Sequence, residues 1–397
     1  MFTPNILISF LPDIFILYAV TFFIFLIVLV HYFPQLNSKF FSHHVYHLLL
    51  GALGMVGYLI YVGEGRILGD AAVSLSFYPT DLLSTAPLVV VCKLVVVALT
   101  LLCVYLHLPV ITDRARLALE YSILILLITE ASLLLMSINE LSLAFLALEL
   151  QTLGLVAFAF VGHASPQGVI VEAVVRYFFN TAYASACFLF GLSILYALIG
   201  GLHLETIPVF LGSALSRADG SLYILILLAL ILIFYTIFFK LTLAPFHQWV
   251  GDLYQGTSGY VGSYFSIVTK IPMLILLYRL LNAVSLSSLA PFFWTIPIIA
   301  IIALAVGNIY AFHQPNFRRF WAMASVGHMG QILLALYCFN PDTALVAFLY
   351  LFSYLTGNLF VWAVLFHQSA RPTMGNGFRE FLQKTFRLLS LNDRRLS

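Results

Sequence analysis

Apolar residues occur along this chain in long blocks that short polar connections separate. A helix that crosses a bilayer needs about 20 largely apolar residues, and eleven stretches meet that requirement. They cover residues 6–30, 44–63, 86–107, 118–138, 141–161, 173–198, 221–241, 260–281, 293–312, 320–339 and 343–367. The pattern therefore predicts an all-α polytopic membrane protein with about eleven transmembrane helices.

The connections are too short to fold separately, so the helices themselves define the organisation. Residues 1–110 hold three predicted helices, residues 111–285 hold five and residues 286–370 hold three, before a basic amphipathic tail at residues 371–397. The first helix contains Asp13 and lacks a small-residue cleavage site, which favours a retained helix over a removable presequence.

Lysine and arginine are distributed unevenly between the two sides of the predicted bundle. Twelve lie after odd-numbered helices or in the tail, three lie on the opposite side, and three lie within or at the end of apolar spans. Positive residues remain on the side where the protein is synthesised. This predicts an N-terminus on the outer side and a C-terminus on the inner side.

Composition narrows the class of protein further. The chain is 62% hydrophobic and 9% charged, against roughly a quarter charged in soluble proteins. This composition, together with a net charge of +2, predicts neither a nucleic-acid partner nor a soluble nucleotide-binding enzyme. The chain contains 36 phenylalanines and 21 tyrosines but 4 tryptophans, a bias that is typical of an A+T-rich genome and favours a mitochondrial origin. The cysteines lack the spacing of an iron–sulfur, haem or zinc site, so we expect no redox centre or cofactor in this chain; they are Cys92, Cys103, Cys187 and Cys338.

Three ionisable residues fall deep inside predicted spans, where each costs about 2.5–3.5 kcal/mol. Glu149 lies at the middle of its helix, Lys240 ends an apolar run five residues before Pro245, and Lys270 stands two residues before Pro272. Proline removes a backbone hydrogen bond and breaks or kinks a helix, so both lysines lie at predicted weak points.

A buried Glu–Lys pair can simply fix the register of two helices. One carboxylate and two ammonium groups cannot all be neutralised in pairs, however, which favours a proton-carrying role. Burial in general lowers the pKa of a lysine and a nearby carboxylate raises it, so a pair that forms and separates can take up and release a proton. Glu149, Lys240 and Lys270 are therefore the predicted proton-translocation residues.

Other polar residues carry weaker signals. Glu130 could face the bundle, whereas Lys93 is expected to extend to the headgroups. His328 suits a proton relay or a packing role, and His247 suits a relay or an interfacial anchor. Three further histidines have metal-ligand spacing but are interpreted as interfacial residues of a loop at a helix start; they are His43, His44 and His47.

Several of these residues belong to longer motifs. KLTLAPFHQW at residues 240–249 and DLYQG at 252–256 resemble the signature of the antiporter-like subunits of respiratory complex I, of the chain 2 type of NADH:ubiquinone oxidoreductase. The stretch around Glu149, Lys270 at the expected distance, NFRRF at 316–320 and GHMG at 327–330 extend the resemblance over about residues 120–382.

The resemblance implies two inverted five-helix repeats, each with one broken helix. Residues 111–285 would form the first repeat, broken near Lys240 and Pro245, and residues 286–370 an incomplete second one. It also implies that Glu149, Lys240 and Lys270 form a proton half-channel. Flavin mononucleotide, iron–sulfur clusters and ubiquinone would belong to the larger complex.

The sequence departs from the family pattern at several points. A position often occupied by lysine is Arg176, which cannot release a proton and is interpreted as structural or electrostatic. The usual Trp-x-Pro-Asp reads WVGD at 249–252, and Thr257-Ser258 replaces Ala-Pro, which should loosen that loop.

The chain also stops before the family's later helices. We expect a separately encoded polypeptide to supply them and to pack on a lipid-facing surface that includes Gly327, His328 and Gly330. Phe378, Phe381 and Leu382 would give the tail an apolar stripe on the matrix surface.

Together these features predict a proton-translocating subunit of complex I in the mitochondrial inner membrane, its N-terminus in the intermembrane space and its C-terminus in the matrix. Its expected partners are other membrane-arm subunits and lipids such as cardiolipin. Two alternatives stay open, a subunit of a multisubunit cation/proton antiporter and a structural subunit that does not pump.

Overall fold

The computed structural model describes residues 11–32, 39–70, 87–111, 115–161, 167–215, 220–285, 290–337 and 341–370. Within these ranges the chain forms helices, and the isolated bridge between Glu140 and His203 is not part of a strand. The helices are α2 (Leu11–Tyr32), α3 (Lys39–Asp70), α4 (Pro87–Ile111), α5 (Ala115–Ser137), α6 (Leu141–Val161), α7 (Gln167–Ile199), α8 (Thr206–Leu215), α9 (Gly220–Lys240), α10 (Gln248–Gly256), α11 (Gly259–Ile267), α12 (Lys270–Ser285), α13 (Ala290–Phe312), α14 (Phe317–Tyr337) and α15 (Pro341–Ala370).

The predicted all-α membrane fold is confirmed. Ten stretches of the described chain are long and apolar enough to cross a membrane, and α2 contributes a shorter apolar stretch, Phe15–Ile27. Each predicted span corresponds to a helix or, for residues 260–281, to α11 followed by α12. Residues 6–10 of the first predicted span lie outside the described residues.

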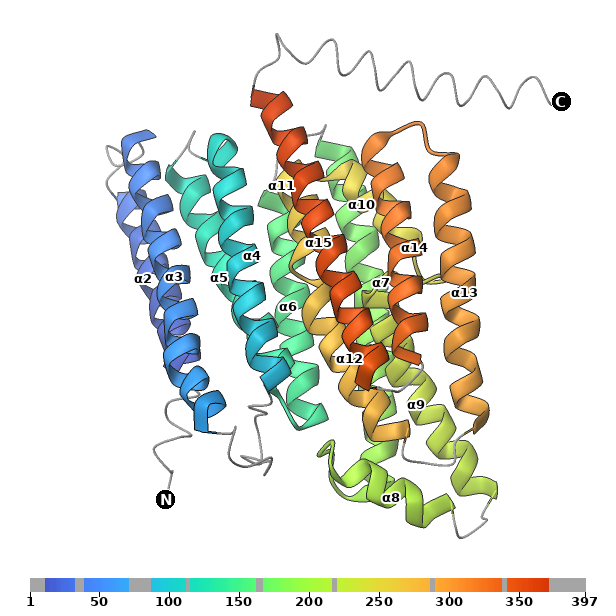
Figure 1. Ribbon diagram of the computed structural model, residues 1–397. Coiled ribbons are helices and arrows are strands. Elements are labelled where there is room, and N and C mark those ends of the chain that lie inside the picture. The colour runs from blue at the N-terminus through green and yellow to red at the C-terminus, as the bar shows by residue number, and fades with distance from the viewer. Residues whose placement is uncertain are drawn as a thin grey trace, which may run out of the picture.

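The long helices run roughly side by side (Figure 1). α2 and α3 form one flank of the bundle, α13 and α14 form the other, and α4, α5 and α6 lie between them. α8 lies across one end of the bundle instead of spanning it. In the centre, α9 continues into α10 and α11 into α12, so two interrupted helices occupy the middle of the fold.

Glycine decides how closely α13 and α14 approach. A Cβ added at Gly330 would lie 2.8 Å from the carbonyl oxygen of Ala300, and one at Gly327 would lie 3.0 Å from Asn308. Small residues allow such close backbone packing. The expectation that Gly327 and Gly330 face lipid and wait for a missing partner is therefore wrong, because α13 already occupies that face.

Two other expectations concern the histidines near the start of α3 and the C-terminal tail. His44 and His47 are exposed within α3, which begins at Lys39, and are not in a loop. The predicted amphipathic tail at 371–397, Cys338 and the side chain of His43 lie outside the described residues.

Candidate functional site

The first interruption follows the end of α9. The amide of Leu243 donates to the carbonyl of Phe238 at 3.0 Å, and that of Thr242 donates to Phe239 at 3.0 Å. These two bonds form a Schellman motif, which ends a helix with a residue in the left-handed conformation. That residue is Thr242, with φ of 63°. The predicted break between Lys240 and Pro245 is therefore present, and it begins two residues after the lysine.

Thr242 is an unusual residue for this position, because a β-branched side chain disfavours the left-handed region. Its hydroxyl donates to the carbonyl of Leu241 at 2.5 Å and accepts from the ammonium of Lys270 at 2.8 Å. Lys270 also donates to the Leu241 carbonyl at 3.2 Å. Strained residues persist where the surrounding structure holds them, and they cluster at functional sites.

The second interruption comes directly before Lys270. α11 ends at Ile267, Val268 and Thr269 form a turn, and α12 begins at Lys270 itself. The lysine is 2% exposed. The carboxyl end of α9 favours the ammonium, whereas the amino end of α12 opposes it, since the two helix ends carry opposite partial charges. Lys270 thus lies directly at the break between α11 and α12 and beside the break that ends α9. Pro272, two residues later, indicated only that a break was near.

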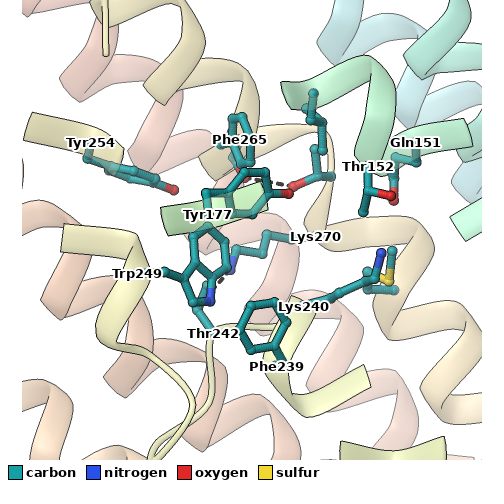
Figure 2. A pocket seen from close by; sticks show the side chains of 13 residues that line it. Gln151, Thr152, Tyr177, Phe239, Lys240, Thr242, Trp249, Tyr254, Phe265 and Lys270 are labelled. Atoms are coloured by element: carbon teal, nitrogen blue, oxygen red, sulfur yellow. Dashed lines mark hydrogen bonds between the residues drawn. The ribbon is translucent and has the colours of Figure 1, made fainter. Parts of the chain in front are cut away.

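Both lysines line one internal cavity of about 20 Å³, enough for about one or two water molecules. Its wall combines polar, aromatic and apolar side chains from α6, α7 and the two interrupted helices; they are Gln151, Thr152, Leu155, Tyr177, Phe239, Lys240, Thr242, Trp249, Tyr254, Phe265, Thr269, Lys270 and Met273. Figure 2 shows Lys270 directed toward Thr242, and Lys240 directed the other way. Trp249 also lines the cavity, and its indole Nε1 is buried without a hydrogen-bond partner in the described part of the chain.

Lys240 extends from the end of α9 to α6, where its ammonium donates to the carbonyl of Leu148 at 3.4 Å. Glu149 is the next residue along α6, and its carboxylate acts electrostatically on Lys240. The Oε1 atom of Glu149 is buried and accepts no hydrogen bond. The two side chains therefore interact through space without a direct hydrogen bond, an arrangement that small movements of either helix would tighten or loosen.

Residues 138–391, more than half of the chain, match the family described as "NADH:quinone oxidoreductase/Mrp antiporter, TM". The chain belongs to this family. This range contains Glu149, Lys240 and Lys270.

Among its relatives, the chain is 29% identical over 323 residues to the chloroplastic NAD(P)H-quinone oxidoreductase subunit 2 of Mesostigma viride, covering 81% of this chain and 62% of that protein. It is 33% identical over 230 residues to NADH-quinone oxidoreductase subunit N of Desulfovibrio desulfuricans, covering 57% of this chain and 45% of that one. The chain thus spans less than two thirds of either relative.

Solved structures agree with this assignment. A chain of respiratory complex I from Thermus thermophilus with bound aureothin superposes with a TM-score of 0.66 and 26% identity, covering 88% of this chain and 70% of that one. A chain of the Mrp complex from Dietzia sp. gives a TM-score of 0.73 at 20% identity, covering 93% and 66%. The second likeness shows a shared fold.

Of the predicted histidines, neither His247 nor His328 lines the lysine cavity. His247 stands before the first turn of α10, its ring 6.1 Å from that of Tyr310. His328 contacts α15 through a 2.7 Å hydrogen bond between its Nδ1 and the hydroxyl of Tyr350. That hydroxyl also donates to Gln331. A relay role for either histidine stays a prediction.

The expected position of Lys93 is wrong. The residue is 6% exposed inside the protein and does not extend to the headgroups. It interacts electrostatically with Glu130, which is 3% exposed, so an opposite charge within the bundle holds the lysine there. Glu130 does face the interior.

The loop after α10 is not loosened by Thr257 and Ser258, contrary to expectation. Both residues are buried, and the Thr257 hydroxyl donates to the carbonyl of Leu253 at 2.7 Å. Arg318 of α14 donates to the Thr257 carbonyl at 3.1 Å. These bonds replace the rigidity that a proline would provide.

Asp252 of α10 links three helices at the surface. It accepts from Arg176 of α7 at 3.2 Å and from Arg319 of α14 at 2.9 Å, while Arg176 also pairs with Glu172 at 2.6 Å. Arg176 thus takes part in ion pairs, in keeping with the structural or electrostatic role expected of it.

Sequence reasoning missed Gln151, Tyr177 and Thr242 as members of the site. Gln151 and Thr242 each stand two residues from a predicted proton carrier. A polar side chain that close to a buried charge was the available signal. Nothing in the pattern distinguished Tyr177 from the many other tyrosines.

Proposed function

We propose that this chain translocates protons as a membrane-arm subunit of complex I, with Glu149, Lys240 and Lys270 as the carriers. The observation that supports this most directly is the shared cavity: two lysine side chains from two interrupted helices line one space that has room for water. Water and hydroxyl groups can pass a proton between amines that do not touch.

The geometry supports a sequence of steps. Lys240, influenced by Glu149, holds a proton at the α6 side of the cavity, and the amine of Lys270 receives it on the side of Thr242. When Lys270 carries the proton, the Leu241 carbonyl and the Thr242 hydroxyl accept its hydrogen bonds. When it is neutral, the hydroxyl can rotate and donate to the amine.

In this proposal the chain supplies no electron-transfer group. Flavin mononucleotide, iron–sulfur clusters and ubiquinone belong to other subunits of the complex, and quinone reduction there drives the proton movement. The partners are other membrane-arm subunits and lipids such as cardiolipin. The location is the mitochondrial inner membrane, with the N-terminus in the intermembrane space and the C-terminus in the matrix.

Two substitutions at Lys270 separate proton transfer from a structural charge. Lys270→Arg keeps a positive charge and its hydrogen bonds but cannot release a proton, because arginine stays protonated in proteins. Lys270→Met removes the charge. If the residue only fixes register, Arg should preserve pumping driven by NADH in sealed vesicles. We expect both variants to assemble and both to lose pumping through this chain, and a normal pumping ratio in Lys270→Arg would refute the transfer role.

A cation/proton antiporter subunit is the second candidate, since the family includes Mrp antiporters and the Dietzia complex shares the fold. Purification of the tagged chain under mild detergent distinguishes the two. A complex I subunit brings flavin and iron–sulfur proteins with it, whereas an antiporter subunit does not.

A further inference from the structure

Three ionisable side chains come together between α2, α4 and α5, apart from the lysine cavity. Glu130 of α5 is 3% exposed and Lys93 of α4 is 6% exposed, while Asp13 of α2 is partly buried. Asp13 and Lys93 both act electrostatically on the Glu130 carboxylate. None of the three lines the lysine cavity, whose wall comes from α6, α7 and the two interrupted helices.

The group lies toward one face of the membrane. α2 and α4 begin, and α5 ends, at the same end of the bundle (Figure 1). Lys93 comes six residues after the start of α4 and Glu130 seven residues before the end of α5, so each lies about 10 Å inside the bundle. Asp13 stands in the first turn of α2. The partly buried carboxylate is therefore nearest the membrane face, with the two buried groups deeper.

The charges of this group do not balance when all three residues are ionised. Two carboxylates and one ammonium leave one negative charge in an apolar environment, which is expensive. One additional proton on Glu130 makes the group neutral, because a nearby carboxylate disfavours a second negative charge. The Oε2 atom of Glu130 is buried and accepts no hydrogen bond. A buried carboxylate oxygen with no hydrogen bond is costly when it carries a charge, and protonation of Glu130 reduces that cost.

We propose that Asp13, Lys93 and Glu130 form a second intramembrane proton-binding site, in which Glu130 takes up and releases the proton. Its role, which rests on the proposed function, is to exchange protons between the lysine cavity and the membrane face where α2 begins. Gln151, which lines the cavity, donates to the hydroxyl of Ser132 at 3.0 Å, so the cavity is in polar contact with α5, the helix that carries Glu130.

Other charged or titratable groups on helices that pack against α5 have different surroundings. Arg279 of α12 donates to the carbonyls of Met136 and Ile138, near the end of α5. His107 of α4 is hydrogen-bonded to Tyr121 and Ser263. Glu149 and Glu140 of α6 lie beside Lys240 and Ser142, and His44 and His47 of α3 are exposed. The charges that act on Glu130 are those of Asp13 and Lys93.

Carboxyl labelling of the intact complex tests the site. Dicyclohexylcarbodiimide reacts with protonated carboxyl groups in apolar surroundings, and mass spectrometry of digested membranes locates the adduct. We expect Glu130 to be labelled near neutral pH and the adduct to vanish in Glu130→Gln. Glu120→Gln, which removes a partly buried carboxylate from the same helix, is the matched control and should leave the labelling of Glu130 unchanged.

Substitutions of Lys93 and Asp13 should shift the pH range over which Glu130 is labelled in opposite directions. Lys93→Met removes the positive charge that favours ionised Glu130, so labelling should persist to higher pH. Asp13→Asn removes a repelling negative charge, so labelling should end at a lower pH. A permanent ion pair between Lys93 and Glu130 would instead give an unlabelled Glu130 in the wild type, and it would give no shift in Asp13→Asn.

Infrared difference spectroscopy tests the site even if the carbodiimide cannot reach Glu130. A protonated Glu130 contributes a carboxylic acid C=O band that is present in the wild type and absent in Glu130→Gln, whether or not the reagent reaches it. Absence of both the adduct and the band overturns the site. Loss of the transfer role at Lys240 or Lys270 would overturn the proposed function and leave both signals of Glu130 intact, so the two failures are distinguishable.

Discussion

The ammonium of Lys270 lies 2.8 Å from the hydroxyl of Thr242, a residue with φ of 63° on the opposing broken helix. The left-handed backbone that ends α9 also directs this hydroxyl at the lysine. One residue therefore terminates a helix and completes the coordination of a buried charge, which explains why a β-branched side chain is found where glycine would be easier.

Thr242→Val tests this relationship, because it keeps the shape of the side chain and removes the hydroxyl. A hydrogen bond to a charged group contributes about 1.5–3 kcal/mol, so Lys270 should hold its proton less well. We expect less pumping and a pH profile displaced to lower pH in Thr242→Val, and near-normal behaviour in Thr242→Ser. The same profile in both variants would limit Thr242 to a structural role.

Lys240→Met should leave assembly largely intact, since methionine has a similar length and lacks only the charge. A positioned proton-transfer group contributes about 10²–10⁴-fold to a rate, so translocation through this chain should fall by about two orders of magnitude or more. The measurement is the ratio of protons pumped to NADH oxidised in sealed vesicles. A variant that pumps at the wild-type ratio would remove Lys240 from the path.

Glu149→Gln should cause a similar but milder loss. The carboxylate influences Lys240 through space and accepts no hydrogen bond at Oε1, so it tunes the lysine without having to carry every proton. Pumping assays over a range of pH provide the comparison. A loss deeper than that of Lys240→Met would show that Glu149 itself transfers protons.

Gly330→Ala should destabilise the protein by about 1–3 kcal/mol, because the new methyl group would meet backbone atoms of α13 at 2.8 and 2.9 Å. Gly357→Ala in α15 is the matched control, since an added Cβ there has no neighbour within 4 Å. It should be neutral or slightly stabilising. Thermal unfolding in detergent gives both values, and equal effects would contradict the packing of α13 on α14.

Arg176→Ala should have little effect. Its side chain is 59% exposed, and exposed ion pairs contribute about 0–1 kcal/mol. We expect a small loss of thermal stability that high salt removes, together with a normal pumping ratio. A pumping defect that persists when stability is unchanged would assign Arg176 a part in proton transfer.

The sequence by itself determined the membrane class and the spans, and it indicated three charges at membrane depth, of which Lys270 is fully buried. Runs of about 20 apolar residues specify spanning helices almost without regard to neighbours, and a charge inside such a run stands out because of its cost. Proline also marked the break after Lys240. Pro272 indicated an interruption near Lys270. In the structure the interruption lies at Val268 and Thr269, before the lysine, and Pro272 lies within the first turn of α12.

Tertiary structure decided which faces of the helices meet, and the errors of sequence reasoning came from there. Lys93 could have extended to the headgroups, but a glutamate 37 positions away holds it inside. Gly327 and Gly330 could have faced lipid, but they pack on α13. Thr242 became part of the site only because a second broken helix brings Lys270 to it. Hydropathy specifies that a residue is at membrane depth, whereas the neighbour it meets depends on helix packing between residues far apart in the chain.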